Sequence, residues 1–383
     1  MSRNSREVTI GCLGGSGSRS CPSDPARDPQ IRYNLHVRIL VIGGSGFIGS
    51  FVVSRLVHDH HDVAVLHRGR HASILPAAVT AIAADRHALH QHAAAIARFR
   101  PEVVIDMILS SGTQASALLD VVSGVAGRVI ALSSMDVYRA CGVLHGFEPG
   151  PLEPLPLTED SPRRTRRQTY PPAQIAALQQ VFGWLDADYD KVAVEDVILG
   201  NGRMPATVLR LPMVYGPGDP LHRLFPIVKR IDDGRRAIVM EEGLAKWRSP
   251  RGYVENVAAA VVLAATSERA SGRVYNVAEE VACSEEQWAR EVGAAAGWRG
   301  EIVVLPTEQT PPHLRVPYNV AQHWVPETTR LRRELDYRES VARREAIART
   351  IAWERANPPA RVDPAQFDYA AEDRVMARNL DRC

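Results

Sequence analysis

A glycine-rich turn constrains this chain more than any other feature of its sequence. The run GGSGFIG at residues 43–49 follows directly on the apolar run VRILVI at residues 37–42. A strand that ends in glycines and turns at once into a helix lets backbone N–H groups approach a pyrophosphate, and the helix N-terminus adds partial positive charge. Because residues 50–57 continue as an amphipathic helix and residues 62–66 as a second apolar run, the segment predicts a βαβ unit that binds a dinucleotide. The predicted contacts in this loop are Gly43, Gly46, Phe47, Ile48 and Gly49.

The pattern of short apolar runs predicts the fold class. Runs rich in Val, Ile and Ala recur at residues 79–84, 102–106 and 128–132, separated by helix-length stretches. Continuous apolar runs suit strands buried on both faces, so we expect an α/β fold, a Rossmann-like doubly wound parallel sheet between helix layers. We expect strands at residues 206–211, 274–277 and 301–305 and helices at 191–199, 254–266, 285–296 and 340–355.

This pattern also suggests how the chain is divided. We predict a dinucleotide-binding domain over residues 36–215 and a smaller substrate lobe over 216–383, some segments of which return to the first domain. In such folds the ligand lies outside the carboxyl ends of the strands, here roofed by the lobe. Residues 1–35 show no lasting period and are interpreted as a disordered leader or an over-called start site.

One internal segment interrupts the rhythm of strands and helices. Residues 142–187 contain many prolines and the basic run RRTRR at 163–167. The segment is too long for an ordinary connection in an α/β unit. It is either a substrate-covering insertion or a mobile surface loop, and we interpret its arginine run as solvated charge.

Composition excludes several other classes of protein. The formal net charge of +2 gives no electrostatic reason to expect nucleic acid or an anionic membrane as a partner. Five cysteines without a C-x-x-C pair indicate neither a zinc site nor a disulfide framework, which fits a reducing cytoplasm. The run HDHHD at residues 58–62 falls where a helix should turn into a strand, so we interpret it as a solvated turn and predict no metal.

Four further motifs, in order along the chain, point to one family. They are SSMDVY at residues 133–138, LRLPMVYGPG at 209–218, RGYVENVA at 251–258 and GRVYNV at 272–277. Together with the glycine turn they resemble the extended short-chain dehydrogenase/reductase superfamily, in its NAD-dependent epimerase/dehydratase branch. The resemblance runs from Val37 to about Trp353, and Asn256 stands where the family usually has Asp.

The resemblance implies a serine, a tyrosine and a lysine as catalytic groups. In the family a lysine ammonium and the cationic nicotinamide make the tyrosine hydroxyl acidic, so that it exchanges a proton with the substrate. The serine holds the substrate oxygen and the lysine also binds the nicotinamide ribose. By position in their motifs, Ser134 and Lys191 match these residues, and Ser133 is expected at the cofactor. A hydroxyl at Ser134 that only caps the following turn is the alternative.

The tyrosine departs from the family pattern Y-x-x-x-K. Ala187 stands four residues before Lys191, and Tyr189 stands only two residues before it. Residues i and i+2 do not share a helix face. Either the helix begins near Tyr189 and the preceding turn brings its ring to Ser134, or another tyrosine such as Tyr170 serves, or the proton relay is lost.

The end of the second strand bears on the choice of cofactor. An acidic residue there would favour NAD, but this chain has HRGR at residues 67–70. Guanidinium groups suit a phosphate dianion, so NADP is favoured over NAD, with Arg68 as the clamp. Asp85 matches the family residue that binds the adenine amino group, although a strand-end cap would look the same in sequence.

We therefore predict an NAD(P)-dependent oxidoreductase, epimerase or dehydratase that transfers hydride at nicotinamide C4 and acts on a hydroxyl- or carbonyl-bearing small molecule. The alternative is a dinucleotide-binding module, regulatory or RNA-associated, that has lost the tyrosine relay. A sugar nucleotide is one candidate substrate. Its diphosphate could be held by four arginines, which a lobe that binds no diphosphate could also carry: Arg210, Arg223, Arg248 and Arg251. The superfamily often pairs the helix after the lysine with its copy, which leaves a homodimer open.

Overall fold

The computed structural model describes residues 36–69, 75–167 and 170–380. The predicted leader at residues 1–35 and Arg70 of the HRGR run lie outside the described residues. Everything below concerns the unit that spans residues 33–383.

A seven-stranded parallel sheet forms the centre of the fold. Its order is β10-β6-β5-β4-β1-β2-β3. Every pairing in it is parallel, as expected for a doubly wound sheet. The strands are β1 (Arg38–Ile42), β2 (Asp62–His67), β3 (Thr80–Ala83), β4 (Val103–Asp106), β5 (Arg128–Ser134), β6 (Ala206–Leu211) and β10 (Val274–Asn276). The predicted α/β, Rossmann-like fold is confirmed.

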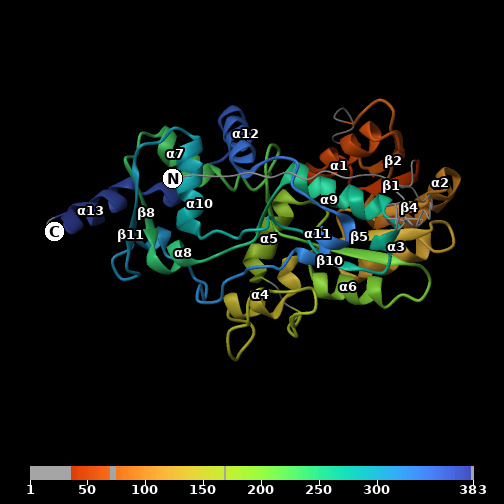
Figure 1. Cartoon of the computed structure of the whole chain (residues 1–383), viewed down its shortest axis with the longest axis horizontal. Coiled ribbons are helices and arrows are strands. Elements are labelled where there is room, and N and C mark those ends of the chain that lie inside the picture. The colour runs from red at the N-terminus through yellow and green to blue at the C-terminus, as the bar shows by residue number, and fades with distance from the viewer. Residues whose placement is uncertain (1–35, 70–74, 168–169, 381–383) are drawn as a thin grey trace, which may run out of the picture. The chain divides into compact units, whose positions relative to one another are not determined.

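Helices cover both faces of this sheet, as Figure 1 shows. On one face α1 (Phe47–His58) packs against α9 (Val254–Thr266) over a core that includes Val52, Leu56 and Val261. On the other, α2 (Ala93–Phe99), α3 (Gly112–Val122) and α6 (Lys191–Leu199) close a second core. The central strands are buried on both faces because each lies between these two cores, which explains their unbroken apolar runs.

The remaining elements follow β6 in the chain. Strand β7 (Met213–Tyr215) pairs in parallel with β9 (Arg251–Tyr253), so two of the four motifs lie side by side. A separate parallel pair joins β8 (Ala237–Glu241) to β11 (Glu301–Leu305). The helices of this part are α7 (Phe225–Asp232), α8 (Glu242–Lys246), α10 (Glu285–Ala295), α11 (Thr329–Leu335), α12 (Arg343–Ala356) and α13 (Tyr369–Leu380). Strand β10 and helix α9 return to the large sheet, whereas the proposed domain boundary stays a prediction.

The structure explains why Asn256 stands where the family usually has Asp. Its side chain is buried in α9, where the amide Nδ2 donates to the carbonyl oxygen of Val341 at 2.8 Å. Its Oδ1 accepts from the Val341 backbone N–H at 3.0 Å. An ionised carboxylate could accept but not donate, so only the amide satisfies both groups.

The interrupting segment begins within α4 (Arg139–Leu144) and contains α5 (Pro172–Val181). Our interpretation of its arginine run as solvated charge is wrong for Arg164, whose side chain is buried. Arg164 Nε donates to the Asp136 carbonyl oxygen at 2.5 Å, and Nη2 lies 3.1 Å from Asp190 Oδ1. The arginine is buried because it pairs with a carboxylate and satisfies carbonyls that water cannot reach. Arg166 and Arg167 are exposed, as expected.

In the part of the chain that the structure describes, no helix combines the length and the apolar character needed to cross a membrane.

Candidate functional site

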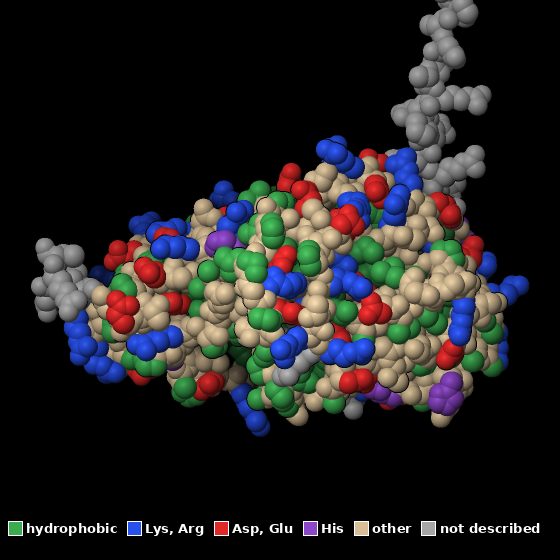
Figure 2. Space-filling model, turned by 90° about the horizontal axis from the view of Figure 1, so that it is seen from below, with side chains coloured by type: hydrophobic (Ala, Val, Ile, Leu, Met, Phe, Trp, Pro, Cys, Tyr) green, Lys and Arg blue, Asp and Glu red, His purple; other side chains and the backbone are tan. Residues whose placement is uncertain are grey.

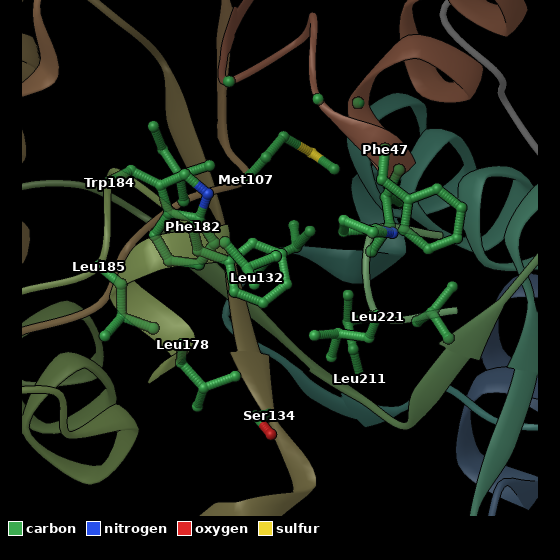
Figure 3. Close-up of a pocket in the computed structure, with 18 of the residues that line it drawn as sticks. Phe47, Met107, Leu132, Ser134, Leu178, Phe182, Trp184, Leu185, Leu211 and Leu221 are labelled. Carbon is green, nitrogen blue, oxygen red and sulfur yellow. The ribbon is translucent and has the colours of Figure 1, made fainter. Parts of the chain in front are cut away.

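A cavity of about 1080 Å³ lies at the carboxyl ends of the sheet strands. Its volume lies slightly above the usual range of roughly 300–1,000 Å³ for small-molecule sites. In Figure 3, Phe47, Leu211 and Leu221 lie on one side of the cavity, Phe182 and Trp184 lie on the other, and Met107 lies between them. Every residue predicted to be catalytic or to bind the cofactor lines it: Gly43, Gly46, Phe47, Ile48, Gly49, Arg68, Asp85, Ser133, Ser134, Tyr189 and Lys191.

The glycine turn is shaped for close approach by backbone. Gly43 has φ +83°, a left-handed conformation that L side chains rarely adopt. A Cβ at Gly49 would lie 2.3 Å from the Gly43 carbonyl oxygen, so α1 can pack on the turn only without a side chain there. Helix α1 has no acidic residue in its first turn and no side-chain cap at Gly46. The first turn of α1 therefore borders the cavity and carries no carboxylate of its own, and this arrangement fits a pyrophosphate.

Arg68 and Asp85, which we expect at the adenosine half of a dinucleotide, both line the cavity. Arg68 is exposed, and its Nη1 donates to the Gly183 carbonyl oxygen at 3.3 Å. Asp85 accepts a hydrogen bond from the His87 backbone N–H at 2.9 Å, so it does act as a cap, while it also lines the cavity. These contacts leave the guanidinium of Arg68 accessible to an anion.

Sequence reasoning missed a buried ion pair beside these residues. Arg86 lines the cavity, and its Nη2 lies 2.9 Å from Asp106 Oδ2 at the end of β4. Nε and Nη1 of Arg86 have no hydrogen-bond partner among the described residues. Burial raises the pKa of Asp106, and the Arg86 charge opposes this shift. The sequence feature that could have suggested this ion pair is the arginine that directly follows Asp85 after the third strand.

The two serines after β5 use their hydroxyls differently. Ser134 Oγ accepts from the Asp136 backbone N–H at 3.2 Å and caps the short helix η3 (Met135–Val137). Ser133 Oγ donates to Glu195 Oε1 at 2.7 Å, inside the protein. Both serines line the cavity, so the capping alternative for Ser134 is compatible with a contact to substrate. The expected cofactor contact of Ser133 stays a prediction.

Lys191 is the first residue of α6 and is buried. Its Nζ donates to the Leu132 carbonyl oxygen at 3.0 Å and also to that of Leu109. Burial lowers the pKa of Lys191 to about 8, although nearby carboxylates, that of Asp136 first, favour its charged form. The lysine therefore stands at the end of β5 with a hydrogen-bonding Nζ on the cavity wall.

Tyr189 reaches the cavity, and its hydrogen bond goes to Asp136. The Tyr189 hydroxyl donates to Asp136 Oδ2 at 2.7 Å, and the Tyr170 hydroxyl donates to the same oxygen at 3.3 Å. The two rings stack with centroids 6.2 Å apart. Lys191 Nζ lies 5.9 Å from the centroid of the Tyr189 ring. Burial, then the Asp136 charge, raises the pKa of both tyrosines well above its ordinary value.

Asp136 was not singled out by sequence reasoning, although it stands inside the SSMDVY motif. Its side chain is buried, and it lines the cavity with both tyrosines. An acidic residue in an otherwise apolar turn after a central strand was the available signal. The structure thus adds Asp136 as a fourth polar group to the three that the sequence suggested, Ser134, a tyrosine and Lys191.

The interrupting segment forms one wall of the cavity. Leu178, Phe182, Trp184 and Leu185 lie together on the side opposite Phe47 in Figure 3. Tyr170, which precedes α5, lines the same wall. Of the two interpretations offered for this segment, a covering insertion is the one that agrees with its contacts.

The chain belongs to a known family. A family model described as the NAD dependent epimerase/dehydratase family matches residues 39–278. Solved structures agree on the fold. The dTDP-glucose 4,6-dehydratase of Bacillus anthracis, in complex with NAD, has a TM-score of 0.62 at 14% identity and covers 84% of this chain and 97% of that one. The UDP-glucose 4-epimerase of Thermotoga maritima, with UDP-glucose, has a TM-score of 0.59 at 18% identity over 83% and 99%.

Two reductases are among its relatives in sequence. The chain is 26% identical over 295 residues to the 2'-dehydrokanamycin reductase of Streptomyces kanamyceticus, covering 74% of this chain and 75% of that protein. It is 27% identical over 275 residues to the 2-alkyl-3-oxoalkanoate reductase of Stenotrophomonas maltophilia, covering 68% and 76%. An NAD(P)-dependent epimerase, dehydratase or reductase of the extended short-chain type is thus the enzyme class of this chain.

Proposed function

We propose that the chain is an NADP-dependent oxidoreductase that transfers hydride between nicotinamide C4 and a carbonyl or hydroxyl carbon of a small molecule. One observation carries the proposal: Ser134, Tyr189 and Lys191 line the same cavity as the glycine turn. The turn that we propose binds a pyrophosphate and the groups that we propose move a proton therefore border one space. The names of the two reductase relatives agree with ketone reduction.

The side chains have distinct roles in this proposal. When bound, the nicotinamide donates or accepts the hydride. Ser134 Oγ donates a hydrogen bond to the substrate oxygen, and the Tyr189 hydroxyl gives that oxygen its proton during reduction. Lys191 holds the ribose and stabilises the negative charge left on the tyrosine. For this transfer the Tyr189 hydroxyl must turn from Asp136 to the substrate.

The alternative of a binding module rests on one observation, the hydrogen bond that holds Tyr189 on Asp136 and opposes its ionisation. An RNA-binding version of that module needs a basic stripe or patch. Figure 2 shows Lys and Arg side chains interspersed with Asp and Glu over the face in view. The enzyme proposal therefore takes precedence, and its catalytic test is the Lys191 substitution below.

Replacing Arg68 with alanine tests the cofactor. We expect wild-type protein to bind NADPH more tightly than NADH, and Arg68→Ala to weaken NADPH binding about 10- to 100-fold, since a hydrogen bond to a charged group contributes roughly 1.5–3 kcal/mol. The affinity of the Arg68→Ala protein for NADH should equal that of the wild type, because NADH lacks the 2′-phosphate. Calorimetric titration with each cofactor measures both affinities.

The matched control for that titration is Arg203→Ala. Arg203 is an exposed arginine paired with Asp120 and does not line the cavity. The Arg203→Ala substitution should leave the affinities for NADPH and for NADH unchanged. Equal binding of NADPH and NADH by the wild type would contradict the phosphate clamp, and binding of neither would refute the enzyme proposal itself.

A further inference from the structure

We propose that the substrate of this site carries no diphosphate: it is a phosphate-free ring compound with a carbonyl or hydroxyl group. This inference rests on the proposed function and narrows its substrate class. It follows from the partners of the four arginines that could have held a second diphosphate, and from the side chains that form the substrate half of the cavity.

Arg210 is already neutralised. Its Nε and Nη2 donate to the two carboxylate oxygens of Glu195 at 2.9 and 2.7 Å. Its Nη1 donates to the Tyr138 hydroxyl at 3.0 Å. The side chains of Arg210 and Glu195 are 3% and 0% exposed, and neither residue lines the cavity. If Arg210 left this buried pair to bind a ligand, the carboxylate of Glu195 would remain buried without its hydrogen-bonded counter-ion.

Arg251 and Arg223 also have carboxylate partners. Arg251 Nη2 lies 2.6 Å from both oxygens of Glu285, and its guanidinium lies over the Trp288 ring, 4.4 Å from the centroid. Arg223 Nη1 donates to Asp219 Oδ1 at 2.6 Å and to the Val214 carbonyl oxygen at 2.9 Å. Of these two arginines, only Arg223 lines the cavity, and buried Asp219 lines it beside Arg223.

Arg248 is the fourth arginine. It is exposed and does not line the cavity, and its Nε donates to the Ala282 carbonyl oxygen at 2.9 Å. Among the described lining residues, the other Lys and Arg side chains are Arg68, Arg86 and Lys191. Two of these lie at the adenosine half, and Lys191 stands at the proposed nicotinamide. Among the described residues of the substrate half, a second diphosphate would therefore meet no guanidinium that lacks a carboxylate partner.

The substrate half presents aromatic rings and a carboxylate instead. The His145 ring lies 5.3 Å from the ring of Tyr170 and 4.9 Å from that of Tyr318, measured between centroids. Trp247 and Trp324 line the same cavity. Burial lowers the pKa of His145, which disfavours a positive charge on its ring. Aromatic faces pack well against an uncharged ring, whereas the Asp136 charge repels a diphosphate.

The test titrates the whole protein with UDP and with UDP-glucose in the presence of saturating NADPH. We expect no calorimetric or fluorescence response to either nucleotide up to millimolar concentration. A micromolar affinity for UDP or UDP-glucose would overturn the inference. The preceding titration with NADPH alone separates the two proposals, because failure to bind NADPH counts against the proposed function, and nucleotide binding on top of bound NADPH counts only against this inference.

A second readout compares rates of NADPH oxidation. The probes are a panel of phosphate-free ring ketones that differ in hydroxyl substitution, with UDP-4-keto-glucose as the nucleotide-linked ketone. We expect the fastest ketone of the panel to be consumed at least 10-fold faster than the UDP-linked ketone, and Trp247→Ala to raise its KM with unchanged NADPH affinity. A rate with the UDP-linked ketone equal to or above that with every panel member overturns the inference.

Discussion

Replacing Lys191 with methionine is expected to lower kcat about 10²- to 10⁴-fold, the usual contribution of a positioned acid–base system. Lys191 Nζ borders the cavity beside the Tyr189 ring, and methionine keeps the length and burial of the side chain without its charge. Steady-state rates of NADPH oxidation with a ketone that the wild type reduces measure the loss.

Lys229→Met is the matched control. Lys229 pairs with Asp233 on the surface of α7 and is not a cavity residue. The Lys229→Met protein should keep kcat within about twofold of the wild-type value, because Lys229 does not line the cavity. Its fold should also be kept, since a single surface ion pair contributes only ~0–1 kcal/mol to stability. A Lys191→Met protein that keeps wild-type kcat would contradict the assignment of the proton-transfer group and favour the binding-module alternative.

The Lys191→Met substitution is also expected to change how the stability of the protein depends on pH. The folded-state pKa of Lys191 is about 8, below its ordinary value of 10.5. Between these two values the unfolded chain binds more protons at this residue than the folded chain does, so this residue makes stability rise with pH. The penalty for burying the ammonium is full below pH 8. Lys191→Met should therefore gain stability over the wild type at pH 7, and the gap should narrow as the pH rises through this window.

Replacing Glu195 with alanine is expected to reduce the free energy of unfolding by about 3–5 kcal/mol, because breaking a buried ion pair leaves an uncompensated charge. Glu195 accepts two hydrogen bonds from Arg210 and a third from Ser133. Its loss would leave the guanidinium of Arg210, which belongs to β6, buried with two neutral hydrogen-bond partners, the Tyr138 hydroxyl and the Glu159 carbonyl oxygen. Urea unfolding followed by tryptophan fluorescence measures the change.

Asp120→Ala serves as the control for this experiment. Asp120 pairs with Arg203 at 2.8 Å, and the two side chains are 67% and 58% exposed. Its removal should cost no more than about 1 kcal/mol. A loss below that value for Glu195→Ala as well would show that the buried network tolerates an unpaired Arg210, and it would remove the argument that this arginine is unavailable to a ligand.

The regular elements around the site could be predicted because each carries its own pattern. The helix at residues 191–199 and the strands at 206–211 and 301–305 match α6, β6 and β11 to the residue. Strand β8 was not predicted. Four of its five residues form a short apolar run, which is not specific to a strand, and its partner β11 lies far along the chain. Pairing between distant segments leaves no local signal.

The polar contacts of the site were less predictable. Arg164 looked like surface charge within a basic run, yet Asp190 and the Asp136 carbonyl oxygen bury it. The displaced Tyr189 does reach the cavity, because the turn before α6 brings its ring there, and its hydroxyl meets Asp136. Which carboxylate faces which arginine or tyrosine depends on elements that are far apart in sequence.

By itself, the sequence determined the glycine turn, the parallel sheet and the family, since glycine spacing, apolar runs and ordered motifs are local properties of the chain. Only the tertiary structure decided that Asp136 joins Tyr170 and Tyr189, and that Arg210, Arg223 and Arg251 are held by carboxylates. The physical reason is that burial and pairing set the chemistry of a charged group. Burial and pairing exist only once the chain has folded.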